Sequence, residues 1–569
     1  MPDIWRQFRE LSRLFFGRFI ENDLISVDGD TQGTLVGILG LLAAPGLFIP
    51  FFEFLQFGSH PLCWLPWWQR DLFSIPDKVL HLGLSMAVLG VVTVLQWDAI
   101  LPDRRDYAVL KPLPIGMATM FTAKLWALLR FWAIFTLVLN ALSVFLFPLA
   151  VTQNSTLPEL LWFVRCHALA VLAANGFVFL LMIAIQGVLL NLLGWQRYRR
   201  AAPYAQSILV AAILGMFFLA IGVSLQIDPD EPVRGLLGWL PPVWFMGLYE
   251  HELGWSQAAF VGLAATAWRA LGLTALIGAL AYAISYRRSI TAAFEQGEGP
   301  TSLPTSLRLA IDTALNRWVL RTPAERASFH FVRATILRSR SHRVLVATYA
   351  GVGFALVFQS VATMVAYGNR IWWRSPQGPL LPSALVLALF ILAGLRYAFS
   401  VPAEWRANWA FQIAGGADES GYLVGVRKAV VLLAILPLFT LLLPIHIALW
   451  GWRAGAIHIA FGALVAWLLM ELILLGMEKV PFTCSYVAGK ANLRSSWPLY
   501  VAGYLAYVSA CAWAEYHIQE QPALLVILVV FVALVKLAVE RYRILQAPDF
   551  HLRFDEAPEP VVRTLGLQE

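Results

Sequence analysis

Ionisable side chains inside apolar segments are the residues of this sequence that could do chemistry within a membrane. Arg130, Arg269 and Glu471 lie deep within long apolar runs. A charge at the centre of a membrane-spanning helix costs about 2.5–3.5 kcal/mol on insertion scales, so such residues usually face a bundle interior or a water-filled cavity. We therefore expect these three residues either to line a substrate path or to hydrogen-bond between helices.

Signatures of catalysis and metal binding are missing from the sequence. It has no GxxxxGK[ST] phosphate-binding loop, no HExxH zinc motif and no GxSxG nucleophile motif. The run from Glu250 to Glu252 lacks a well-spaced third metal ligand, and the four cysteines show no CxxC spacing. The sequence therefore predicts no enzyme activity, no cofactor and no metal site. Uphill transport by this chain would need an ion gradient or a separate ATPase.

Composition places the chain in a membrane. Of its 569 residues, 59% are hydrophobic and only 14% are charged, whereas soluble domains have about 45–50% apolar and about 25% charged residues. The apolar residues gather in runs of roughly 20, the length that a spanning helix needs. Many of the 23 tryptophans lie at the edges of these runs, as in an interfacial aromatic belt. The net charge of +7 suits basic loops beside anionic lipid and does not indicate nucleic acid binding.

The loops between the apolar runs predict the topology. With the N-terminus in the cytoplasm, the inner segments hold 30 lysines and arginines and the outer segments hold 7, as the positive-inside rule requires. This alternation favours an even number of spans and both termini in the cytoplasm. We expect the chain in a plasma membrane, in particular a bacterial inner membrane. The predicted spans are 33–56, 78–101, 119–151, 164–194, 205–227, 256–285, 344–368, 380–401, 424–450, 455–478, 497–516 and 521–540.

The predicted fold is therefore all-α, a polytopic membrane protein with about twelve transmembrane helices in two six-helix halves. A polar, arginine-rich stretch divides the halves, and the similar order of elements on each side suggests distant repeats. The predicted parts are a cytoplasmic amphipathic helix (1–32), the first half (33–285), a linker with a second such helix (286–343), the second half (344–540) and a cytoplasmic tail (541–569).

The segment from Ile4 to Phe19 predicts an amphipathic helix. Its residues Phe8, Leu11 and Phe15 follow Ile4 at spacings of four, three and four, which places them on one helix face, with arginines on the other. Such a helix lies in the inner interface with its basic face toward lipid phosphates or an acidic partner. A plain anchor helix fits the pattern equally well.

The loop after the second span is short, charged and bounded by proline. Asp103 can cap a short helix, and Pro112 and Pro114 would end it. We expect a rigid helix that presses on another protein, with a solvated loop as the alternative. The second half has a similar proline-marked loop that begins at Val401 and Pro402.

The run 235–250 is apolar and aromatic, but Pro241 and Pro242 are expected to interrupt it. It is too short to span a bilayer. We expect an interfacial or re-entrant element at the outer side, which needs protein partners for its free backbone groups.

With these three features, the chain resembles the permease subunit of ABC-2 type exporters. The resemblance covers most of 1–290 and extends by topology to 320–540. It implies that the N-terminal helix is a connecting helix, that the loops after the second and eighth spans hold coupling helices for a separate ABC ATPase, and that the outer run is a re-entrant element. The residues implied for ATPase coupling are Asp103, Arg104, Arg105, Tyr107, Lys111, Glu404, Trp405 and Arg406, and those for the outer element are Pro241, Pro242, Trp244 and Phe245.

Many permeases of that family have six spans and dimerise, so twelve spans imply a fused pair. The partners implied are ABC ATPase subunits, membrane lipid and an exported substrate that the sequence does not identify. One alternative is an ion-gradient-driven carrier of the major facilitator type, which shares the arrangement of six plus six spans and has an acidic–basic motif where Asp103 and Arg104 stand. A membrane scaffold with no transport activity is a further alternative.

Overall fold

The fold was analysed in a computed structural model of the chain. The residues that it describes are 2–20, 40, 42–59, 62–100, 115–153, 155–224, 238–295, 305–366, 375–376, 378–403, 409–414, 419–484, 493–546 and 552.

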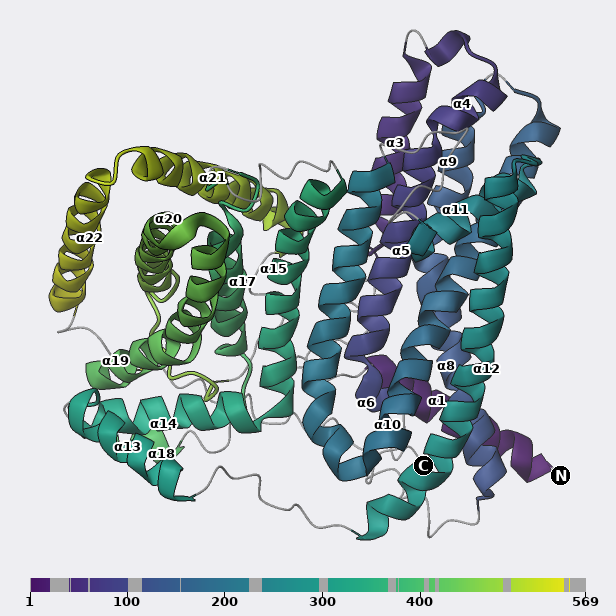
Figure 1. The fold of residues 1–569 in the computed structure, drawn as a ribbon. Coiled ribbons are helices and arrows are strands. Elements are labelled where there is room, and N and C mark those ends of the chain that lie inside the picture. Colours follow the sequence, from purple (N-terminus) through teal and green to yellow (C-terminus); the bar gives the residue numbers. More distant parts are fainter. Residues whose placement is uncertain are drawn as a thin grey trace, which may run out of the picture. The chain divides into compact units, whose positions relative to one another are not determined.

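Every regular element among these residues is a helix (Figure 1). In chain order, the helices of the first half are α1 (Pro2–Ile20), α3 (Pro45–Gly58), η1 (Leu62–Trp64), α4 (Trp67–Phe73), α5 (Ile75–Leu95), α6 (Trp97–Ile100), α8 (Met117–Asn140), α9 (Ser143–Val151), α10 (Leu157–Ser224), α11 (Pro241–Glu252) and α12 (Ala258–Glu295). They are followed by α13 (Thr305–Trp318), α14 (Pro323–Arg338), α15 (Arg340–Ala366), α17 (Ser383–Ala398), α18 (Trp409–Ala414), α19 (Glu419–Val430), the π-helix η4 (Val431–Ile435), α20 (Leu436–Ile473), α21 (Leu493–Glu520) and α22 (Leu524–Gln546).

Seven described helical stretches are long and apolar enough to cross a membrane. Together with the all-helical structure, they support an all-α, multi-pass membrane protein. The count of about twelve spans and the side on which the termini lie stay predictions. The seven stretches are Ile75–Leu95, Ala118–Val151, Leu157–Tyr198, Ala201–Gly222, Ala258–Ser285, Ser341–Val361 and Ser420–Ile473.

Two glycines break helices that would otherwise be continuous. Gly194 in α10 has φ +70° and Gly451 in α20 has φ +83°, a left-handed conformation that glycine adopts without steric cost. A Cβ on Gly455 would lie 2.8 Å from the backbone nitrogen of Ile447. The segments on either side of Gly451 therefore meet directly. Both breaks fall near boundaries that the sequence predicted between neighbouring spans.

Several other predicted spans agree less closely with the helices. The predicted span 119–151 is divided into α8 and α9, and α17 has only 16 residues. Helices α21 and α22 cover the last two predicted spans but are not among the seven membrane-crossing stretches. Of the first predicted span, the described helix α3 covers only the second part.

The chain divides into two compact units. The first is Met1–Gly299 with Phe354–Gly368, and the second is Pro300–Gly353 with Asn369–Glu569. The division between Gly299 and Pro300 falls within the predicted linker 286–343.

In the first unit, α10 packs against both α5 and α12, and α11 packs against these same three helices. Helices α4, α9 and α11 lie toward one end of α5, and α1 and α6 lie toward the other (Figure 1). One apolar core joins these elements, with Phe57, Trp97 and Phe245 fully buried.

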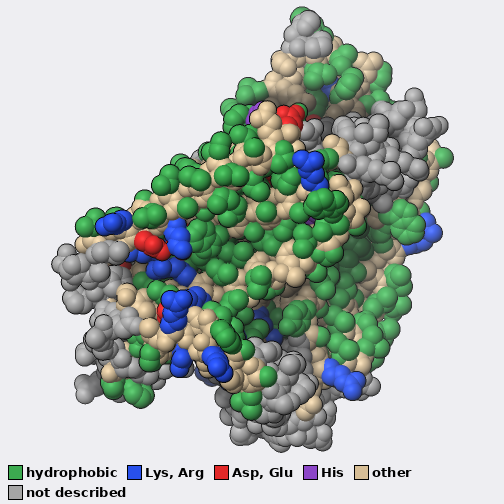
Figure 2. All heavy atoms as spheres, turned by 60° about the vertical axis from the view of Figure 1, so that its left-hand side comes forward, with side chains coloured by type: hydrophobic (Ala, Val, Ile, Leu, Met, Phe, Trp, Pro, Cys, Tyr) green, Lys and Arg blue, Asp and Glu red, His purple; other side chains and the backbone are tan. Residues whose placement is uncertain are grey.

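In the second unit, α14 packs against α19, and α20 packs against α17, α21 and α22. Helix α22 exposes large apolar side chains, among them Val526, Leu534 and Leu537, as expected for a surface in contact with lipid. Figure 2 shows hydrophobic side chains over much of the described part of the visible face.

Candidate functional site

The residues predicted to couple to an ATPase lie outside the described part of the chain. They are Asp103, Arg104, Arg105, Tyr107, Lys111, Glu404, Trp405 and Arg406. The helices on either side of the two loops are described, however, and they show how each loop is flanked.

In the first unit, α1 packs against α8, the helix that follows the predicted coupling loop. The face of α1 that includes Leu11 and Phe15 is buried. On α8, the Lys124 Nζ atom lies 4.8 Å from the centre of the Phe15 ring. The Arg130 guanidinium likewise lies 4.5 Å from the Phe16 ring. These cation–π contacts tie α1 to the start and the middle of α8.

In the second unit, α14 packs against α19, the helix that follows the second predicted loop. The Lys428 Nζ atom of α19 donates hydrogen bonds to Glu325 Oε2 at 2.6 Å and to the Val319 carbonyl at 2.9 Å. A Cβ on Gly425 would lie 2.1 Å from Ser328 Oγ, so only glycine allows this approach. Each half thus places a helix that precedes its spans against the helix that follows the loop.

Local sequence explains why α14 begins where it does. Thr322 is the N-cap, its Oγ1 accepts a hydrogen bond from the Glu325 backbone N–H at 3.2 Å, and Pro323 occupies the first turn. Glu325 Oε2 in turn accepts from the Arg321 backbone N–H at 2.8 Å. Burial opposes ionisation of Glu325, but the hydrogen bonds from Lys428 and the Arg321 N–H outweigh it and lower the pKa of this carboxyl.

The three residues predicted to line a substrate path or to bridge helices have different surroundings. Arg130 contacts α1, as described above. Arg269 is exposed on α12 and donates to the Ala265 carbonyl of its own helix at 3.0 Å. Glu471 is buried and accepts a hydrogen bond from Arg543 at 2.7 Å. The Glu471 contact is the helix-bridging arrangement that the sequence analysis gave as the alternative to a path.

The predicted outer element is a continuous 12-residue helix, α11. Pro241 and Pro242 lie in its first turn, where a missing N–H costs no hydrogen bond, so they start the helix instead of interrupting it. Trp244 Nε1 donates to the Gly238 carbonyl at 2.8 Å, and Phe245 is fully buried. The helix is short and enclosed by protein, as expected for an element that does not span the bilayer.

The most concentrated group of buried charges lies where α4, α5 and α11 meet. Lys78 Nζ donates to Asp71 Oδ1 and to Glu250 Oε1, the latter at 2.5 Å, and all three side chains have no solvent-exposed surface. Trp255 Nε1 donates to the other Asp71 oxygen, Oδ2, at 2.8 Å. The ammonium also lies 4.9 Å from the Tyr249 ring centre. We call Asp71, Lys78 and Glu250 the buried triad.

The two carboxylates of the buried triad are not equivalent. Asp71 receives a donor at each oxygen, whereas Glu250 Oε2 is buried without a hydrogen-bond partner. Burial, followed by the nearby Asp71 carboxylate, raises the pKa of Glu250 above its ordinary value despite the contact with Lys78.

Further polar groups continue from the buried triad along one face of α5. We call Lys78, His81 and Ser85 on this face the polar stripe. His81 Nε2 lies 3.0 Å from Glu53 Oε2 of α3, and the His81 ring centre lies 5.8 Å from that of His167. Both His167 ring nitrogens are buried without a hydrogen-bond partner. One helical turn further along α5, Ser85 and Asn175 are hydrogen-bonded, with Asn175 Nδ2 donating to Ser85 Oγ at 2.7 Å.

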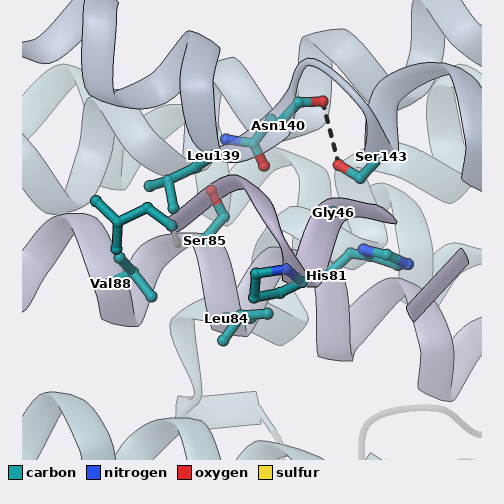
Figure 3. Close-up of a pocket in the computed structure, with 10 residues that line it drawn as sticks. Gly46, His81, Leu84, Ser85, Val88, Leu139, Asn140 and Ser143 are labelled. Atoms are coloured by element: carbon teal, nitrogen blue, oxygen red, sulfur yellow. Dashed lines mark hydrogen bonds between the residues drawn. The ribbon is translucent and has the colours of Figure 1, made fainter. Parts of the chain in front are cut away.

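A small cavity of about 20 Å³ adjoins this stripe, enough for one water molecule. His81 and Ser85 line it from α5, together with Asn140 and Ser143 from the α8–α9 junction (Figure 3). Ser143 Oγ donates to the Asn140 carbonyl at 3.2 Å. The cavity therefore joins the polar stripe of α5 to the break between α8 and α9.

Sequence reasoning missed this stripe, although a signal was present. Ser74, Lys78, His81 and Ser85 follow one another at spacings of four, three and four, which places them on one face of a helix. Lys78 is the first residue of the predicted span 78–101, and the sequence analysis counts it among the seven cations of the outer segments.

The second unit holds a smaller buried group. His458 Nδ1 and Glu515 Oε1 are hydrogen-bonded, with neither side chain exposed. The rings of His446 and His458, on opposite sides of the Gly451 break, have centres 4.3 Å apart. His446 Nε2 lies 3.4 Å from Ser383 Oγ.

Neither unit offers a metal centre among the described residues, where no three His, Cys, Asp or Glu side chains are grouped to hold an ion. The comparisons with family models, with curated proteins and with solved structures found no match.

Proposed function

We propose that this chain is the membrane-spanning permease subunit of an ATP-driven exporter of the ABC-2 type. One observation carries the proposal. In both halves, a helix that precedes the spans packs on the helix that follows the predicted coupling loop, α1 on α8 and α14 on α19.

A lysine takes part in the contact in each half. Lys124 lies in the second turn of α8 and contacts Phe15 of α1. Lys428 lies in the third turn of α19 and pairs with Glu325 of α14. These two helix pairs support a mechanism in which movement of each loop shifts the spanning helix that follows it together with the helix packed against it. A lone anchor helix would not require this repetition.

The proposed mechanism starts outside the membrane. Two copies of a separate ATPase dock under 102–114 and 402–422, and closure on ATP moves the two loops. The movement passes along α8 in one half and along α19 and α20 in the other. A path then opens between the halves for a hydrophobic or amphipathic substrate, in keeping with the scarcity of charge in the spans.

The experiment is affinity purification of the tagged chain from its native membrane in mild detergent and in lipid nanodiscs. We expect a stoichiometric P-loop ATPase that is lost on Arg104→Ala with Arg105→Ala. The matched control is Arg370→Ala with Arg374→Ala in a predicted outer loop, which should retain it. Repeated purification of the wild-type chain alone would overturn the proposal.

A gradient-driven carrier is the second candidate, and the buried ionisable groups of the first unit favour it. Lys78, His81 and Glu53 lie within a helical bundle, where ionisable residues commonly serve ion pathways. Proton flux in proteoliposomes that contain only this chain would support that candidate over the first.

A further inference from the structure

We propose that the buried triad binds one proton, and that Glu250 carries it at Oε2. This proton site lies within the first unit alone and does not depend on the proposed ATPase partner.

The charges of the buried triad do not balance without a proton. Asp71 and Glu250 would contribute two negative charges against the single positive charge of Lys78, and none of the three side chains reaches solvent. An uncompensated charge in such a place is far costlier than protonation of the group. Arg70, the next cation along α4, directs its Nε to the Leu65 carbonyl at 2.8 Å.

The hydrogen bonds decide which carboxyl group holds the proton. Asp71 has donors at both oxygens, Lys78 on Oδ1 and Trp255 on Oδ2, so its ionised form is well satisfied. Glu250 has a donor only at Oε1. Its Oε2 is buried and unpaired, and a proton there removes the unsatisfied charge.

The other two cations near α11 have partners of their own: Arg70 donates to the Leu65 and Val151 carbonyls, and Arg165 lies 3.5 Å from Glu252. Helix α12 carries no ionisable group over its first eleven residues, from Ala258 to Trp268. His167 on α10 is buried, and both of its nitrogens lack a partner. The ionisable groups on the elements packed around Glu250, with only the first turns of α10 counted, are Glu53 of α3, Arg70 and Asp71 of α4, Asp77, Lys78 and His81 of α5, Glu159, Arg165, Cys166 and His167 of α10, and Tyr249, His251 and Glu252 of α11.

A proton fits the site better than a metal cation. The Lys78 ammonium already lies between the two carboxyl groups and would repel a second cation. The unpaired Tyr249 hydroxyl and His167 nitrogens beside the triad add polar groups through which a proton can be exchanged. The His167 and Tyr249 ring centres lie 5.3 Å apart.

Loss of the proton should loosen α11. A second ionised carboxylate would leave a net negative charge buried between α4, α5 and α11. Water can reach that charge only if these helices separate. Cys166 reports on that separation, because its buried Sγ donates to the Glu252 carbonyl of α11 at 3.3 Å.

Infrared difference spectroscopy of the full chain in nanodiscs tests the proposal. We expect a carbonyl stretch from a protonated carboxyl group at neutral pH, absent in Glu250→Gln and retained in Glu252→Gln, the half-buried neighbour. Asp71→Asn should also remove it, because Glu250 alone with Lys78 becomes an ordinary ion pair. A purely structural ion cluster predicts no change in this band in either variant, and that result would overturn the proposal.

Alkylation of Cys166 by a membrane-permeable maleimide, followed by mass spectrometry, is the second measurement. Between the ordinary glutamate pKa of 4.5 and the pH at which the carboxyl band disappears, the ratio of the wild-type rate to the Glu250→Gln rate should rise by up to about tenfold per pH unit, because opening releases one proton there, and it should level off at higher pH. A ratio that stays constant over that pH range contradicts the proposal. This measurement compares only the wild type with Glu250→Gln, so it still decides the question if Asp71→Asn fails to fold.

Discussion

Replacement of Lys78 by methionine should destabilise the first unit more than any exposed charge replacement. Lys78 is fully buried and bonds two carboxyl groups, and methionine keeps most of its length and volume without the charge. Removal of one partner from a buried ion pair costs about 3–5 kcal/mol, because the other charge is left unpaired. Contacts of the ammonium with the rings of Tyr249 and Phe163, at 4.9 and 5.4 Å, are lost as well.

Although Lys78 has two carboxyl partners, the expected loss of stability stays within the range for one unpaired charge. Asp71 keeps its hydrogen bond from Trp255, and Glu250 can stay protonated. We therefore expect Lys78→Met to lower the free energy of unfolding by about 3–5 kcal/mol. The neutral triple variant, with Asp71→Asn and Glu250→Gln added, should recover most of the loss, because neutral replacement of a whole buried cluster is often tolerated.

The assay is unfolding of the chain by denaturing detergent, followed by tryptophan fluorescence. Lys536→Met is the matched control, since Lys536 is half exposed on α22 and lies 3.8 Å from Glu540. It should change the free energy of unfolding by less than about 1 kcal/mol. A Lys78→Met variant as stable as this control would refute the reasoning.

Three further predictions concern the second unit. Thr322→Ala removes the side-chain cap of α14 and should cost about 1 kcal/mol in thermal or detergent unfolding; an unchanged midpoint would show that the cap is dispensable. Gly455→Ala places a Cβ 2.8 Å from a backbone nitrogen and should cost about 1–3 kcal/mol, whereas Gly503→Ala, with open space around it, should be neutral or stabilising, and equal effects would contradict the close approach. The lowered pKa of Glu325 means that its stabilisation is complete above its unfolded pKa of about 4.5 and is lost as pH falls through the folded pKa. Hydrogen exchange of α14 should therefore show weaker protection at acid pH in the wild type, relative to neutral pH, but not in Glu325→Gln.

Sequence patterns predicted an all-helical membrane protein with long apolar helices, because apolar length is a local property. The predicted boundary near 194 and the one near 451 fall at glycines with positive φ, where a helix can break without steric cost. The division of 119–151 at Asn140 was missed, since no glycine marks it and Pro148 lies inside α9. Helix α11 was expected to be interrupted because prolines were weighed without their position in the first turn.

The buried triad could not have been assembled from the sequence. Lys78 and Glu250 are 172 positions apart, and nothing local in either segment indicates the other. Lys78 also stands at the edge of an apolar run, where lysine usually extends to the interface. The spacing from Ser74 to Ser85 could have indicated a polar face on α5, but only the fold shows that this face is buried against α3, α10 and α11.

Photocrosslinking from the two predicted coupling loops tests the central claim most directly. A photoreactive amino acid replaces Tyr107 in one variant and Trp405 in another, and the crosslinked products are identified by mass spectrometry from intact cells. The proposed function predicts that both positions capture the same P-loop ATPase. If neither position captures a nucleotide-binding protein while both variants are present in the membrane, the claim that this chain is the permease of an ATP-driven exporter is contradicted.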